Sequence, residues 1–191
     1  LKAIIVRGTK DVHVANPARL IKLGEHILSR SGPIRTQIIE KSARTYVRFL
    51  LSMGDFGNFS GVLPPELQQE IKDSARKAQE HINSNRDREV ACANCGIRCK
   101  HAYPNPDGGY TFMKCQDWFA PMTATQIFDC DFAVTYMSLC EKYGLDLSTT
   151  ANCIAFSIDL YQKGILTKED TDGLHLEWKN PDVAFALVGK I

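Results

Sequence analysis

The chain has 191 residues, of which 44% are apolar and 24% are charged, and this composition is typical of a globular protein with a sizeable core. Lys and Arg number 23 against 22 Asp and Glu, so the net charge is only +1 and we expect no nucleic-acid partner. No apolar run approaches the roughly 18 residues that a membrane helix needs, and the sequence does not open with a signal-peptide pattern. We therefore expect a cytoplasmic protein with no membrane span.

The two ends of the chain predict that it is a piece of a longer protein. Residue 1 is leucine rather than methionine, and residues 3–6 are a strand-like apolar run. At the other end, Asn180 is expected to cap a helix that begins with Pro181. The apolar series of that helix is still running at Ile191, so we expect further residues beyond both ends.

Hydrophobic periodicity and capping residues predict a mostly α-helical fold with only short strands. Gly32 and Gly144 stand where left-handed caps would end two of the helices, and Ser148 is expected to cap another. The expected helices cover residues 16–32, 34–53, 64–82, 129–144, 148–164 and the stretch from 180 onward. The expected non-helical elements are a glycine- and aromatic-rich loop over 54–61, a turn over 103–109 and short strands over 110–114 and 174–178.

Three closely spaced cysteines are the strongest chemical signal in the chain. Cys92, Cys95 and Cys99 form a C-x2-C-x3-C pattern, and tight turns would let their three thiolates converge on one metal centre. The pattern favours an iron–sulfur cluster that takes a remote fourth cysteine. A zinc site completed by His101 and a set of unligated thiols are the alternatives that the spacing leaves open.

The other cysteines divide into packing residues and one further candidate ligand. Cys140 and Cys153 lie among apolar helical neighbours and are expected in the core, while Cys130 is expected at a helix start. Cys115 follows Cys99 by 16 residues and has a lysine beside it, which favours the thiolate. We therefore count Cys115 as a candidate metal ligand.

Three separated segments, residues 1–10, 91–99 and 141–146, resemble the tungsten-dependent aldehyde:ferredoxin oxidoreductase family. The second segment contains the cysteine triplet, and the third, Glu-Lys-Tyr-Gly-Leu-Asp, is similar to the D-x-x-G-L-D signature of that family. The resemblance implies that residues 1–10 are the exit strand from a missing N-terminal pterin-binding domain. It implies that residues 11–191 are the irregular helical middle domain, truncated before a C-terminal domain.

The resemblance also assigns roles to individual residues. It implies a [4Fe-4S] cluster with three protein ligands in this chain and the fourth in the C-terminal domain, and a tungsten (or molybdenum) bis-pterin. Glu141 stands where the family has aspartate, a longer carboxylate that can still accept hydrogen bonds from pterin amino groups. The implied cluster ligands are Cys92, Cys95 and Cys99, and the implied pterin contacts are Glu141, Gly144, Leu145 and Asp146.

The segment after the cluster motif indicates the kind of reaction. Aldehyde oxidoreductases of the family carry glutamates there, whereas residues 113–118 contain none. Residues 110–115 instead resemble the tungsten-bearing subunit of class II benzoyl-CoA reductases, which implies that Cys115 is a catalytic tungsten ligand. We expect a benzoyl-CoA reductase-like enzyme, with ferredoxin-dependent oxidation of aldehydes to carboxylic acids as the alternative.

The expected partners follow from these reactions. They are a ferredoxin or an iron–sulfur electron-transfer subunit, and a small-molecule aldehyde or acyl-CoA substrate. The alternative of another class is a non-catalytic scaffold domain that binds zinc or a cluster.

Overall fold

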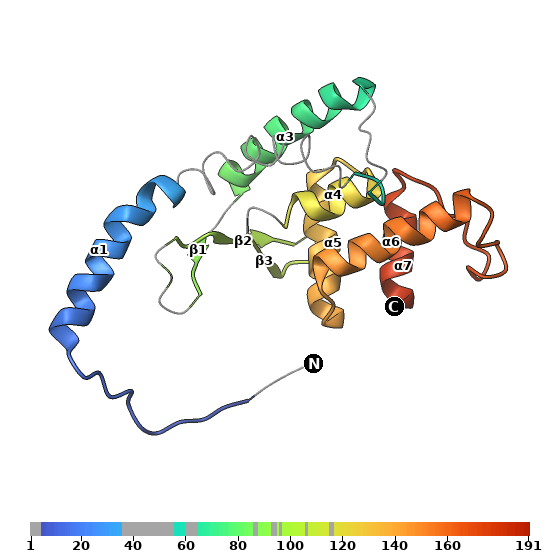
Figure 1. The fold of residues 1–191 in the computed structure, drawn as a ribbon. Coiled ribbons are helices and arrows are strands. Elements are labelled where there is room, and N and C mark those ends of the chain that lie inside the picture. Colours follow the sequence, from blue (N-terminus) through green and yellow to red (C-terminus); the bar gives the residue numbers. More distant parts are fainter. Residues whose placement is uncertain are drawn as a thin grey trace.

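A computed structural model of the chain describes residues 5–35, 56–59, 65–85, 88–92, 95, 97–105, 107–114 and 117–191. Helices cover most of these residues and the strands are short, which confirms the predicted fold class (Figure 1). The elements are α1 (Pro17–Arg35), α3 (Pro65–Asn85), β1 (Arg88–Val90), β2 (Lys100–Pro104), β3 (Tyr110–Lys114), α4 (Phe119–Thr125), α5 (Cys130–Tyr143), α6 (Leu147–Gln162) and α7 (Pro181–Lys190).

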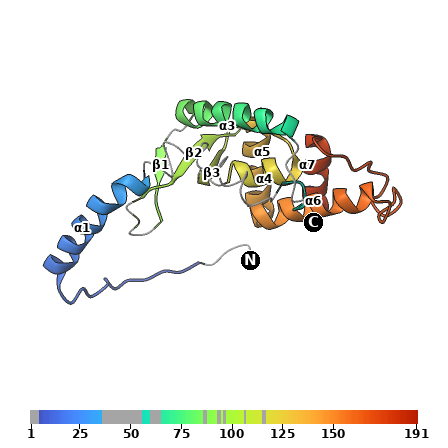
Figure 2. The same ribbon diagram turned by 45° about the horizontal axis from the view of Figure 1, so that its top comes forward.

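Helix α1 and the segment before it lie apart from the rest of the described chain (Figures 1 and 2). The helix begins where the sequence predicts, and the Asn16 side chain accepts the Arg19 N–H at 2.9 Å. It does not end at Gly32, because it continues through Pro33 to Arg35. Its large apolar side chains are each more than half exposed: Leu20, Ile21, Leu23, Ile27 and Leu28.

The strands form a three-stranded antiparallel sheet in the order β1-β2-β3. Strand β3 has the predicted bounds, whereas the sequence did not predict β1 or β2. Three consecutive residues of β2, from His101 to Tyr103, are buried, as expected of a central strand covered on both faces. The turn between β2 and β3 begins at Asn105, later than the predicted start at residue 103, and its backbone N–H donates to the Gly109 carbonyl at 2.8 Å.

Helix α3 runs beside the three-stranded sheet and α5 (Figure 2). Its apolar stripe is narrow but buried, with Ile71, Ala75 and Ala78 all within the core. The first core cluster joins these residues to β2, β3, α4 and α5 through Tyr103, Met113, Trp118, Phe119, Met122, Ala133 and Val134. Helix α3 therefore shares one core with the sheet and the helices α4 and α5.

A second core cluster lies between α5, α6 and α7. Cys140 lies in this cluster, as predicted, but Cys153 is exposed on α6 and that prediction is wrong. Periodicity alone misplaces Cys153 because α6 is apolar over more of its circumference than the core covers. Cys130 is the first residue of α5, in agreement with its predicted place at a helix start.

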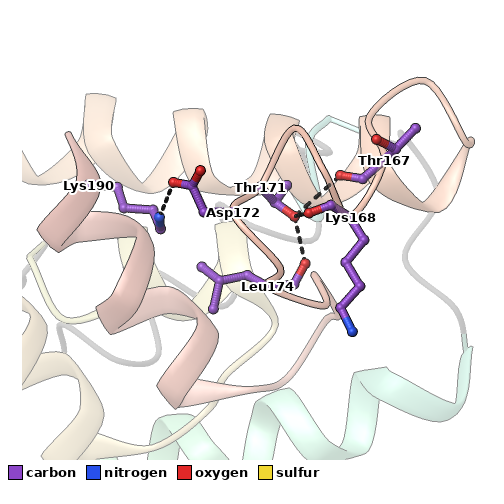
Figure 3. A network of polar contacts seen from close by, with 6 residues as sticks. All are labelled: Thr167, Lys168, Thr171, Asp172, Leu174 and Lys190. Atoms are coloured by element: carbon purple, nitrogen blue, oxygen red, sulfur yellow. Dashed lines mark hydrogen bonds and ion pairs between the residues drawn. The ribbon is translucent and has the colours of Figure 1, made fainter.

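The segment between α6 and α7 is irregular, so the predicted strand over 174–178 is wrong. The Thr171 hydroxyl donates to the Leu174 carbonyl at 2.6 Å and lies beside the carbonyls of Thr167 and Lys168 (Figure 3). An ion pair between Lys190 and Asp172 ties the same segment to α7 (Figure 3).

Some predicted elements fall partly or wholly outside the described residues. Residues 36–53 of the predicted second helix lie outside them, and residues 34 and 35 belong to α1. Residues 3–6 are described only at Ile5 and Val6, and the structure has no strand there. The domain boundary at residue 10 stays a prediction. Among the helices of the described residues, none is both long enough and apolar enough to span a bilayer.

Candidate functional site

The predicted cluster ligands lie in the loop that leads from β1 into β2. The Cys95 N–H donates to the Cys92 carbonyl at 3.0 Å, so the first two cysteines share a tight turn. Arg98 has a left-handed backbone with φ 53°, which turns the chain just before Cys99 and the first residue of β2. Cys92 is exposed, while Cys95 and Cys99 are half-buried.

The three thiols lie near enough to one another to interact electrostatically. Burial raises the pKa of the Cys99 thiol, and the neighbouring thiols of Cys95 and Cys92 raise it further, while Lys114 opposes the rise. Repulsion between three would-be thiolates is what bound iron offsets, so this donor set fits a cluster. Within the described residues, no three His, Cys, Asp or Glu side chains come together as a metal site, and ligation of the cluster stays a prediction.

Cys115 lies outside the described residues, but the residue before it, Lys114, belongs to the sheet. Lys114 is the last residue of β3 and pairs in register with Lys100, the first residue of β2. Lys100 directly follows Cys99. The two predicted ligands Cys99 and Cys115 are therefore sequence neighbours of a single ladder pair.

The predicted pterin-contacting residues form the connection between α5 and α6. Gly144 ends α5 in a left-handed conformation with φ 69°, as predicted. Its N–H donates to the Glu141 carbonyl at 3.2 Å, and the Leu145 N–H donates to the Cys140 carbonyl at 2.8 Å, the pattern of a Schellman motif. Leu145 is half-buried beside the second core cluster.

Asp146, and not Ser148 as predicted, is the N-cap of α6. Its side chain accepts the Thr149 N–H at 2.8 Å, and the helix begins at Leu147. This hydrogen bond is the main reason that the pKa of Asp146 is below its usual value. Asp146 therefore has a structural role in α6 besides the pterin contact that the resemblance implies.

Glu141 joins the last turn of α5 to β3. The Thr111 hydroxyl donates to Glu141 Oε2 at 3.3 Å. Although much of Glu141 is exposed, neighbouring atoms desolvate its carboxyl group and raise its pKa, against the opposing effects of the Thr111 hydroxyl, the Phe112 N–H and the Lys100 charge. The carboxyl group thus lies against the hairpin whose other strand starts directly after Cys99.

Asp117 adds a third carboxylate close to the same end of the hairpin. Its Oδ2 accepts the Lys114 N–H at 2.9 Å, and its Oδ1 lies 3.9 Å from Lys114 Nζ. Burial raises the pKa of Asp117, while the charges of Lys114 and Lys100 oppose the rise and Asp146 adds to it. We call these interacting groups the hairpin charge cluster: Lys100, Lys114, Asp117, Glu141 and Asp146.

Sequence reasoning did not assign Lys100 or Thr111 to the site. The available signal was a lysine next to Cys99 and another next to Cys115. Only the register of β2 with β3 shows that these lysines face each other.

Two buried aromatic side chains, His101 and Trp118, lie next to Tyr103. His101, the zinc ligand of the alternative site, is buried, and its ring lies 6.4 Å from that of Tyr103. Trp118 is fully buried against Tyr103 at a centroid distance of 4.8 Å. Its indole Nε1 has no hydrogen-bond partner among the described residues, and it lies three residues after Cys115.

Known proteins match the chain in sequence and in fold. Residues 51–191 match the family model described as aldehyde ferredoxin oxidoreductase, domains 2 and 3. A stretch of 60 residues is 43% identical to the aliphatic sulfonate oxidoreductase, WOR-like subunit, of Pyrococcus furiosus, and covers 31% of this chain and 9% of that protein.

The fold is similar to that of a chain in the active site complex BamBC of benzoyl coenzyme A reductase with 1,5-dienoyl-CoA. The TM-score is 0.62 at 23% sequence identity, over 95% of this chain and 29% of that chain. The chain therefore spans less than a third of the length of either relative.

Proposed function

Since the chain belongs to the aldehyde ferredoxin oxidoreductase family, as the match over residues 51–191 shows, we propose that it is part of a tungsten (or molybdenum) bis-pterin, [4Fe-4S] oxidoreductase. In this proposal, electrons move between substrate, metal and cluster, and then to a ferredoxin or an iron–sulfur electron-transfer subunit. Cys92, Cys95 and Cys99 hold the cluster, and the turn from Glu141 to Asp146 contacts the pterin.

One observation supports this proposal most directly. The β2–β3 hairpin connects both halves of the proposed site, because β2 starts directly after Cys99 and Thr111 of β3 is hydrogen-bonded to Glu141 at 3.3 Å. A cluster held by the cysteine loop and a pterin held at the end of α5 would thus be attached to one rigid element. Short separation of the two redox groups is what electron transfer between them needs.

The protein groups have separate tasks in this proposal. When bound, the pterin metal and the cluster supply the redox chemistry. The three thiols act as ligands, and Glu141 accepts hydrogen bonds from pterin amino groups while the Thr111 hydroxyl fixes its orientation. Gly144 supplies the left-handed turn that carries the Glu141 end of α5 into the Asp146 cap of α6.

Cys115 is the residue that distinguishes the two candidate reactions. A thiolate from this segment would occupy a position on the metal that an aldehyde oxidase leaves to oxygen, so we propose reduction of an acyl-CoA substrate. The observation in favour is the absence of glutamate from residues 113–118 of the sequence. The matching fold comes from a benzoyl coenzyme A reductase complex, which makes this substrate class the first to test.

Oxidation of aldehydes to carboxylic acids is the second candidate. The name of the matching family favours it, since that name describes an aldehyde ferredoxin oxidoreductase. The sulfonate oxidoreductase relative adds aliphatic sulfonates to the compounds worth assaying.

We also propose that the longer polypeptide supplies the remaining parts of the site. In this proposal, residues 1–10 connect to an N-terminal pterin-binding domain and a C-terminal domain contributes the fourth cluster cysteine. The proposal is consistent with the length of the relatives, of which this chain spans 29% in one case and 9% in the other.

The experiment that tests the proposed function is elemental analysis for W, Mo, Fe and Zn on the full-length protein purified without oxygen. We expect about one W or Mo and about four Fe per chain. Zinc without iron would contradict the proposal and favour the non-catalytic scaffold. In a loaded protein, Cys115→Ser should change the X-ray absorption edge of the tungsten or molybdenum and leave the iron content intact, whereas an unchanged edge would remove Cys115 from the metal.

A further inference from the structure

The ladder between β2 and β3 sets two lysines directly opposite each other. Lys100 and Lys114 are register partners, so their side chains leave the same face of the sheet. Like charges in this arrangement are destabilising unless anions lie nearby. Because Lys100 follows Cys99, the pair makes a cationic feature beside the cysteine loop, where bound thiolates would supply negative charge.

Lys114 contacts Asp117 through both its backbone and its side chain. Its backbone N–H donates to Asp117 Oδ2 at 2.9 Å, and its Nζ lies 3.9 Å from Asp117 Oδ1. Asp117 is only 8% exposed, whereas the Lys114 side chain is 46% exposed, so water partly screens the Lys114 charge. Lys114 pairs in the ladder with Lys100, the residue directly after Cys99, so its backbone lies one residue from the cysteine loop.

We propose that Lys114, which contacts Asp117 and pairs in the ladder with the residue directly after Cys99, raises the reduction potential of the cluster through its positive charge. This inference rests on the proposed function. Lys114 is not a ligand in this proposal and acts only through electrostatics. Reduction adds one electron and hence one negative charge to the cluster, and a nearby cation stabilises the reduced form more than the oxidised form. Asp117 has the opposite effect, since its negative charge partly cancels that of Lys114.

The test is a redox titration of the cluster, followed by electron paramagnetic resonance, on the full-length protein purified without oxygen. We expect Lys114→Met to lower the midpoint potential and Asp117→Asn to raise it. The expected change is a threefold to tenfold change in the ratio of reduced to oxidised cluster at a fixed potential, where tenfold corresponds to about 59 mV for a one-electron couple. Lys114→Arg keeps the charge and should keep the potential.

Lys163→Met is the matched control, because it also removes a lysine from a pair with an aspartate, Asp159 at 2.8 Å, but at the C-terminal end of α6. It should leave the potential unchanged. An unmoved potential in Lys114→Met at normal iron content would overturn the inference, as would shifts of the same sign in Lys114→Met and Asp117→Asn.

If Lys114→Met loses iron, Asp117→Asn decides the question alone, and an unchanged or lowered potential there overturns the inference. A wild-type protein without iron would instead contradict the proposed function itself. The two failures are therefore distinguishable by the iron content of the wild type.

Discussion

The Thr111 hydroxyl donates a hydrogen bond to Glu141 Oε2 at 3.3 Å and so joins strand β3 to the last turn of α5. Thr111 is fully buried, whereas Glu141 keeps part of its surface in solvent. The contact connects the segment after the cysteine loop with the turn assigned to the pterin.

Glu141→Gln should change the pH dependence of stability. The folded-state pKa of Glu141 lies above its usual value because its carboxyl group is desolvated, so the folded protein binds more protons than the unfolded chain between the two values. Rising pH therefore destabilises the wild type in that window, starting near the ordinary value of 4.5. We expect the melting temperature of the variant to rise relative to that of the wild type as pH increases through this window. A difference that does not vary with pH would contradict this prediction.

Asp146→Ala should destabilise α6. The side chain caps the helix by accepting the Thr149 N–H at 2.8 Å, and loss of such a cap costs about 1 kcal/mol. Asp146→Asn keeps the cap and removes the charge, so it should fold like the wild type in urea unfolding. If the carboxylate also contacts a pterin, Asp146→Asn should lower the pterin content of the full-length protein. Equal losses of stability in both variants would argue against the capping role.

Gly144→Ala should lower the free energy of unfolding by about 1 kcal/mol, because alanine is strained at a φ of 69°. Gly189→Ala is the matched control, since Gly189 lies in α7 and a Cβ there meets nothing within 4 Å. Alanine is the better helix former, so this control should be neutral or slightly stabilising. Urea midpoints of the two variants measure the contrast, and equal midpoints would count against the Schellman turn as the source of the effect.

Cys99→Ser should lower the iron content of the full-length protein and abolish electron transfer from the cluster. The reason is that a serine hydroxyl is a poor replacement for a thiolate ligand. Cys153→Ser is the control, because Cys153 is exposed on α6 and is not among the predicted ligands. Iron assays and the broad visible absorption of the purified proteins test both. Normal iron and full activity in Cys99→Ser would remove this residue from the cluster.

The sequence predicted well those features that depend on neighbouring residues. Gly144 ends α5 and Asn180 caps α7, as their local patterns indicate. Two predicted helix boundaries are wrong: α1 does not end at Gly32, and α6 is not capped by Ser148. Glycine permits a helix to end but does not force it to. Asp146 comes two residues before Ser148 and has an extended backbone and a side chain that accepts the Thr149 N–H, so the helix begins earlier.

Contacts between residues that are distant in the sequence could not be predicted from local sequence patterns. The cysteine spacing and the Gly-Leu-Asp turn are visible in the sequence because they span only a few residues. The pairing of Lys100 with Lys114 depends on strand register, and the bond from Thr111 to Glu141 depends on how α5 packs against β3. Register and packing are set by side chains that meet only after the chain has folded, so tertiary structure alone brings these four residues together.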